Sequence, residues 1–133
     1  MATNHSHPDV FHLRWHIYAR AGEWDACLDI ATTLTKTTPK QPFSWASRAE
    51  SFHELGRTRQ AKRLLLRAGK RFRSDSGIAY YLARYSCALG AMVDAMDWLG
   101  RAISNAESNP EQLERRRSYA LEDPVLEPLW RVL

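Results

Sequence analysis

Three glycines recur at a constant interval and constrain the fold more than any other feature of the sequence. They are Gly22, Gly56 and Gly90, spaced 34 residues apart. Each follows one amphipathic run and precedes another, and a helix often ends on a left-handed residue that glycine adopts at little cost. A constant interval of this length is typical of repeat proteins. It predicts a series of helical hairpins, one in each repeat.

Other positions keep the same interval. Eleven residues before each glycine stand Phe11, Trp45 and Ala79, and four before stand Tyr18, Phe52 and Ser86. Five residues after stand Cys27, Ala61 and Ala95, and twelve after stand Leu34, Ala68 and Ala102. The first two columns share one face of a first helix, and the small residues let a second helix approach closely. Because one such hairpin cannot bury its apolar face alone, neighbouring hairpins must stack.

The element boundaries agree with this interval. Pro8, Pro42 and Pro110 each stand where a first helical turn begins, and Asn109 is a good N-cap. We expect helices over residues 8–21, 24–37, 42–55, 58–73, 77–89, 92–106 and 110–121. The tail after Leu121 is predicted to pack as a short terminal turn. The length suits one domain over residues 1–133, with repeats at about 8–41, 42–75 and 76–109 and a cap and tail at 110–133.

This pattern resembles the tetratricopeptide repeat (TPR) family between Pro8 and Glu111. The motif residues are Phe11, Tyr18, Gly22 and Pro39; Trp45, Phe52, Gly56, Ala61 and Ala68; and Leu82, Ala83, Gly90, Ala95 and Ala102. The resemblance implies an all-α, right-handed superhelix of three stacked hairpins with a C-terminal capping helix. Arg14, Trp15 and Arg48 depart from the family pattern, so we expect the first repeat to pack atypically. The alternative is an unrelated helical bundle.

The resemblance also implies a concave groove lined by the first helix of each repeat. The expected partner-binding residues are His12, His16, Phe43, Ser47, Glu50, His53, Tyr80, Tyr81 and Arg84. The other residues expected to line the groove are Asp9, Leu13, Arg20, Glu54 and Cys87. Aromatic and arginine side chains of this kind dominate interface energies. The lysine and asparagine clamp with which some family members grip chaperone carboxylates is absent, so that function is not carried over. The alternative is a solvated groove with no specific ligand.

Histidines could in principle bind a metal in this groove. His12 and His16 lie four residues apart on one predicted helix, and His53 is a candidate third ligand. No glutamate or cysteine joins them at a recognisable spacing, so ordinary hydrogen-bonded histidines are favoured. We expect no metal and no cofactor.

The predicted fourth helix and its flanks are strongly basic. The basic patch consists of Arg57, Arg59, Lys62, Arg63, Arg67, Lys70, Arg71 and Arg73. It could bind an acidic partner or nucleic-acid phosphates. A solvated outer face is favoured instead, because long cationic side chains cover apolar surface well. The aromatic residue of the segment, Phe72, belongs to the predicted buried stripe, which weakens single-strand binding. The net charge of only +4 argues against nucleic acid as the partner.

Sequence signals for catalysis, secretion and membrane insertion are lacking. There is no Gly-x-Ser-x-Gly, no phosphate-binding glycine loop and no His-Glu-x-x-His. Cys27 and Cys87 form no Cys-x-x-Cys motif, which favours a reducing compartment. The first residues do not form a secretory signal, and no apolar run is long enough to span a membrane. We expect a cytoplasmic protein that is not an enzyme.

These observations rank three functions. The first is a protein–protein interaction module, acting as scaffold, adaptor or small chaperone, that binds a peptide or helix in the groove. The second is binding of nucleic acid or an acidic partner through the basic segment 57–73. The third is a self-associating structural repeat protein. We expect a monomer or a weak homodimer.

Overall fold

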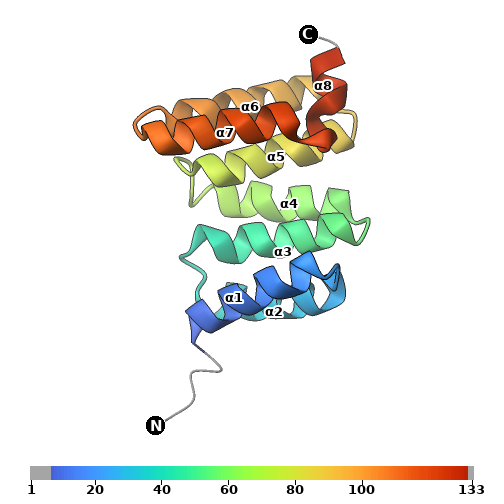
Figure 1. Cartoon of the computed structure of the whole chain (residues 1–133), viewed down its shortest axis with the longest axis vertical. Helices are drawn as coiled ribbons and strands as arrows, with labels where there is room; N and C mark the ends of the chain where they lie inside the picture. Colours follow the sequence, from blue (N-terminus) through green and yellow to red (C-terminus); the bar gives the residue numbers. More distant parts are fainter. Residues whose placement is uncertain (1–6, 132–133) are drawn as a thin grey trace. The chain divides into compact units, whose positions relative to one another are not determined.

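The computed structural model describes residues 7–131, which fold into helices joined by short turns and contain no β-strand. The longer helices form three consecutive hairpins and a further helix (Figure 1). They are α1 (Pro8–Arg20), α2 (Trp24–Thr37), α3 (Pro42–Glu54), α4 (Thr58–Gly69), α5 (Ser76–Ala88), α6 (Met92–Ala106) and α7 (Pro110–Glu122). A 3-10 helix, η1 (Pro124–Leu126), and a short helix, α8 (Glu127–Arg131), follow.

The predicted helix boundaries are confirmed with two corrections. The helix predicted over 58–73 ends at Gly69, because the amides of Lys70 and Arg71 bond three residues back, to Arg67 and Ala68. Glycine, with the greatest backbone freedom, stands at this change of pattern. The tail predicted as a turn instead forms η1 and α8, and its last two residues lie outside the described part.

The three repeated glycines end their helices as predicted. Gly22, Gly56 and Gly90 have φ values of 73°, 82° and 80°. After each glycine, the next amide donates to a carbonyl five residues earlier: Glu23 to Tyr18, Arg57 to Phe52, and Ala91 to Ser86, at 2.9, 2.8 and 2.9 Å. These bonds satisfy carbonyls that the end of a helix leaves without partners.

Replacing Gly90 by alanine is expected to destabilise the protein by about 1–2 kcal/mol. A residue with a Cβ atom is sterically strained in the left-handed conformation that Gly90 adopts. A Cβ at Gly90 meets no atom within 4 Å, so the cost is in the backbone alone. Gly100 lies within α6 and is equally open, but it is helical. Gly100→Ala should therefore stabilise by about 0.5–1 kcal/mol. Urea unfolding of both variants checks this, and effects of the same sign would contradict it.

The chain forms two compact units that divide between Leu64 and Leu65, within α4. In the first unit α2 packs against both α1 and α3. Its core contains Trp15, Cys27, Ile30, Ala31 and Leu34, with Phe11, Tyr18, Trp24 and Phe43 packed around it. Trp15, which stands where the TPR pattern has a small residue, is thus buried at the centre of this core. The single domain predicted from chain length stays a prediction.

The second unit is built on the α5–α6 hairpin. Its core contains Ala79, Tyr80, Cys87, Ala95, Ala102, Ala120, Leu126 and Leu129. Helix α7 packs beside α6, η1 packs against α5, and α8 runs across the end of α6 (Figure 1). The Trp130 indole donates to the Ala120 carbonyl at 3.1 Å, which ties α8 to α7. The C-terminal segment is therefore part of the core of this unit.

Among the described residues, no helix combines the length and the apolar character that a bilayer crossing requires.

Candidate partner-binding site

In the first unit, three of the predicted groove residues meet in one aromatic cluster. The His12 and Phe43 rings are 4.1 Å apart between centroids, and His16 and Phe43 are 5.4 Å apart. Trp15 lies against Phe43 at 5.6 Å with its ring nearly perpendicular. Its indole N–H donates to the Ser51 hydroxyl at 3.1 Å. The cluster thus joins α1 to α3 and rests on a buried tryptophan.

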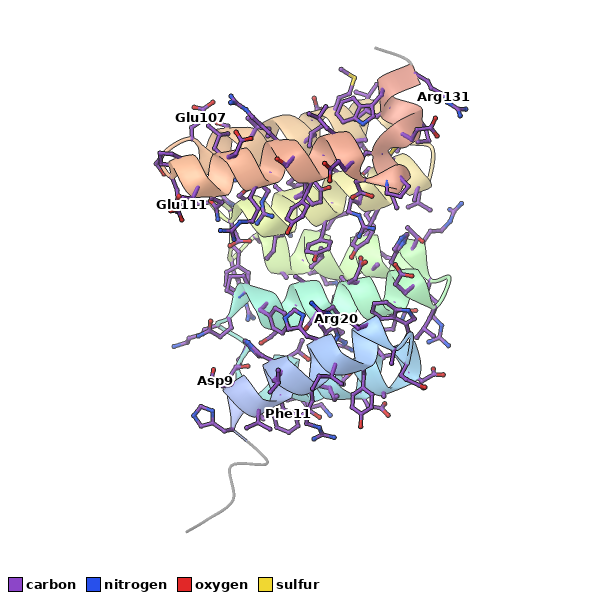
Figure 2. The ribbon with its side chains drawn as sticks, in the orientation of Figure 1. Asp9, Phe11, Arg20, Glu107, Glu111 and Arg131 are labelled. Atoms are coloured by element: carbon purple, nitrogen blue, oxygen red, sulfur yellow. The ribbon has the colours of Figure 1, made fainter. Side chains whose placement is uncertain are left out.

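Beside this cluster, α1 exposes large apolar side chains. Leu13 is 61% exposed and Ile17 is 56% exposed, and they lie about one helical turn apart; His16 on the same helix is also exposed. Asp9 and Arg20 stand near the two ends of α1 (Figure 2). We call Leu13, His16 and Ile17 the α1 surface. The sequence analysis placed Leu13 and His16 in the groove but missed Ile17. Ile17 stands outside the repeated positions predicted to be buried, and an apolar residue there was the only sign of an exposed apolar surface.

His12 is held in an environment that disfavours its charged form. Burial lowers the pKa of His12 below its ordinary value; nearby His16 also lowers it, whereas Asp9 opposes the shift. Its Nε2 atom is buried and has no hydrogen-bond partner within residues 7–131. The imidazole therefore acts mainly as a flat, neutral contact for Phe43.

Acidification is expected to destabilise the protein through His12. Because its folded pKa is depressed, the unfolded chain takes up the proton first, so stability falls as the pH drops below the ordinary histidine value of about 6.5. The loss is complete once the pH has passed the folded pKa. Urea unfolding at several pH values checks this, with His12→Gln as the non-titrating control. Equal pH slopes in wild type and His12→Gln would contradict it.

The remaining predicted groove residues of the first unit are less available than expected. Ser47 is 2% exposed and donates to the Ser44 carbonyl at 3.2 Å, so its short side chain is satisfied within α3. Glu50 is also buried. The sequence analysis expected Ser47 and Glu50 to contact a partner, whereas the structure buries both side chains. His53 Nδ1 is 2.9 Å from the Thr58 hydroxyl, across the α3–α4 turn.

In the described part of the chain, no three His, Cys, Asp or Glu side chains are grouped to hold a metal ion.

In the second unit, a carboxylate from the C-terminal segment lies on α5. Asp123 Oδ2 accepts from the Tyr80 hydroxyl at 2.8 Å and lies 2.7 Å from Arg84 Nε. The Arg84 and Asp123 side chains are 12% and 11% exposed. Asp123 Oδ1 also accepts from the Val125 amide at 3.0 Å. One carboxylate thus pairs with an arginine and a tyrosine of α5 and caps η1.

The position of Tyr80 requires a correction. It is 6% exposed and belongs to the core of the second unit, because η1 covers α5 there. Burial and the hydrogen bond to Asp123 raise the pKa of Tyr80 well above its ordinary value, so its hydroxyl remains a donor. Tyr81 is half-buried, packs edge-on against Tyr80 at 6.2 Å and lies beneath the Arg84 guanidinium. Tyr81 remains a candidate for contact with a partner, whereas the Arg84 side chain is largely buried and already paired with Asp123.

The predicted basic patch is an exposed surface. Arg57, Arg59, Arg63, Arg67, Lys70, Arg71 and Arg73 are exposed, and Lys62 is half-buried. The opposite face of α4 buries Ala61, Leu65 and Ala68, which are at most 4% exposed. The amphipathic pattern predicted for this helix is thereby confirmed, while the role of the patch stays a prediction.

Helical hairpins in this order, each first helix followed by a left-handed glycine, make up a TPR-like helical-repeat fold. A solved structure, the complex of the TPR2AB domain of yeast Sti1 with pHSP90, is similar to this chain with a TM-score of 0.73 and 17% sequence identity. The similarity covers 89% of this chain and 44% of the other, so this chain spans less than half the length of that neighbour. No family model and no curated protein matches the sequence. The predicted TPR-like fold class is confirmed.

Proposed function

We propose that this protein is an interaction module that binds a peptide or helical segment of another protein through its first helices. The observation that carries the proposal is the α1 surface: Leu13 and Ile17 are mostly exposed, and His16 of the same helix is exposed as well. Large apolar side chains so placed gain free energy when a partner covers them. The aromatic cluster packs α1 against α3, and a helix held in this way loses less conformational entropy when it binds.

The comparison supports the same role. The solved neighbour is a TPR domain in complex with pHSP90, so a fold of this kind can hold another polypeptide. In this chain Tyr81 of α5 is a second proposed contact, because its ring is half-buried and an aromatic side chain offers a large contact area. The Arg84 guanidinium over this ring is already paired with Asp123. The proposed role is binding without catalysis, as scaffold, adaptor or small chaperone.

A cytoplasmic location is proposed with it. Cys27 and Cys87 are both buried and form no disulfide. Burial raises the pKa of the Cys27 thiol to about 11, which keeps it protonated and unreactive. Free thiols of this kind are compatible with a reducing compartment, which supports the proposed location.

Site-specific photo-cross-linking in cells tests the proposal. A benzophenone side chain replaces either His16 or Val93, which is 75% exposed on α6 and serves as the control. We expect position 16, and not position 93, to cross-link a defined partner polypeptide on irradiation. Equal cross-linking from both positions, or none from position 16, would contradict a binding role for the α1 surface.

A further inference from the structure

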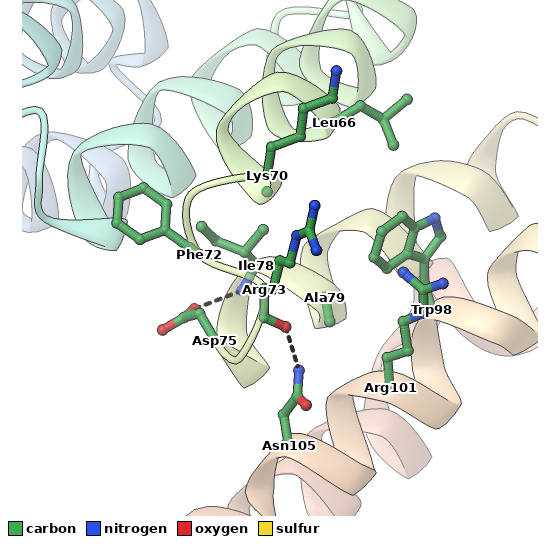
Figure 3. Close-up of a pocket in the computed structure, with 11 residues that line it drawn as sticks. Leu66, Lys70, Phe72, Arg73, Asp75, Ile78, Ala79, Trp98, Arg101 and Asn105 are labelled. Atoms are coloured by element: carbon green, nitrogen blue, oxygen red, sulfur yellow. Dashed lines mark hydrogen bonds between the residues drawn. The ribbon is translucent and has the colours of Figure 1, made fainter.

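The second unit contains a pocket that neither the α1 surface nor the α5 contacts include. It has a volume of about 450 Å³ and lies between the end of α4, the α4–α5 turn, α5 and α6 (Figure 3). The residues that carry the argument are Leu66, Lys70, Arg73, Ile78, Trp98 and Arg101. A volume of this size accommodates a large side chain or a small ligand.

The chemistry of the pocket is divided between an apolar wall and cationic side chains. Leu66, Ile78 and Trp98 supply apolar surface, and Leu66 remains 40% exposed. Lys70, Arg73 and Arg101 supply three exposed positive charges from the turn and from α6. None of the three forms an ion pair with another residue in the described range 7–131.

The one acidic residue of the lining does not neutralise these charges by direct pairing. Asp75 Oδ2 accepts from the Ile78 amide at 2.9 Å, as the N-cap of α5 (Figure 3). The backbone of the turn is also held, because Asn105 Nδ2 donates to the Arg73 carbonyl at 3.1 Å. The cationic side chains therefore extend from a fixed backbone, which lowers the cost of ordering them on a ligand.

We propose that this pocket binds an acidic segment of a partner polypeptide, which inserts one large apolar side chain beside Leu66 and Trp98. The flanking carboxylates of the segment pair with Lys70, Arg73 and Arg101, where arginine can bind a carboxylate in bidentate fashion. This site is separate from the α1 surface and does not depend on the function proposed above.

The geometry favours an acidic peptide over nucleic acid. Single-stranded nucleic acid relies on bases stacked on open aromatic faces. Here the Arg101 guanidinium lies over the Trp98 ring at 4.6 Å and covers one of its faces. A second copy of the chain is disfavoured by its net charge of +4.

The test is a titration of the ¹⁵N-labelled full chain with the blocked peptide EEELFEEE, followed by NMR, with affinities from calorimetry. We expect shifts at the Trp98 indole and at residues around the pocket. The double variant Arg73→Gln with Arg101→Gln should bind about tenfold more weakly, or worse. The matched control, Arg59→Gln with Arg63→Gln, removes the same charge from exposed residues outside the pocket and should bind almost as wild type.

Two further ligands separate the alternatives. The peptide EEESSEEE keeps the charge but lacks the apolar side chains, and we expect it to bind more weakly than EEELFEEE. Equal affinity of the two peptides, or equal loss in the two double variants, would reduce the site to general charge attraction and overturn the proposal. Tighter binding of a single-stranded oligodeoxythymidylate at the Trp98 indole would overturn it in favour of nucleic acid. Absence of binding by EEELFEEE at millimolar concentration would also overturn it.

Discussion

Replacing Trp15 by alanine is expected to lower the free energy of unfolding by about 3–5 kcal/mol, the usual cost of deleting a buried tryptophan side chain. Trp15 is 6% exposed and contacts both Trp24 and Phe43, so its loss leaves a cavity among α1, α2 and α3. It also removes the donor to Ser51 Oγ. Urea unfolding followed by circular dichroism measures the change.

Trp15→Phe separates the two contributions of this side chain. It keeps an aromatic ring in the core and loses the indole N–H and part of the volume, so the cost should fall to about 1–3 kcal/mol. Ser51 Oγ still donates to the Ser47 carbonyl at 2.7 Å, so its hydroxyl is not left without a partner. A loss below about 1 kcal/mol for Trp15→Ala would show that the first hairpin does not depend on this tryptophan.

Replacing Asp123 by alanine is the second change with a large expected effect. Arg84 would lose the carboxylate 2.7 Å from its Nε, and the Tyr80 hydroxyl would lose its acceptor, both in a largely buried setting. Removing one partner of a buried ion pair costs about 3–5 kcal/mol, because the other charge loses its compensation. We therefore expect a loss of about that size, measured by urea or thermal unfolding.

Glu127 provides the matched control for Asp123. It is a carboxylate of the same C-terminal segment, pairs with Arg131 at 2.8 Å, and is 55% exposed. Because exposed pairs contribute little, Glu127→Ala should change stability by less than about 1 kcal/mol. Equal effects of the two substitutions would mean that Asp123 does not anchor the segment to α5.

The sequence was sufficient to predict the helices because their signals are local. The left-handed conformation of Gly90, the helix start at Pro110 and the cap at Asn109 each depend on a few neighbouring residues. The small residue Ala95 is fully buried, as its column predicted. Each of these features is set by backbone sterics or by one short hydrogen bond, which explains why they could be read without a structure.

The candidate site could be predicted less well because it depends on contacts between distant residues. Tyr80 and Asp123 are 43 positions apart, and no sequence pattern links them. The burial of Ser47 could not be read from a polar side chain at a predicted groove position. The pocket at Trp98 was also missed, because its charges come from both the turn after α4 and a later helix.

The binding role of the α1 surface is tested most directly by the affinity for the polypeptide that cross-links at position 16. The double variant Leu13→Ser with His16→Ala should bind it at least about tenfold more weakly than wild type, a loss of about 1.4 kcal/mol. Val93→Ser, an equally polar change at an exposed site on α6, should leave the affinity unchanged. Wild-type affinity in a folded Leu13→Ser, His16→Ala variant would contradict the proposed function.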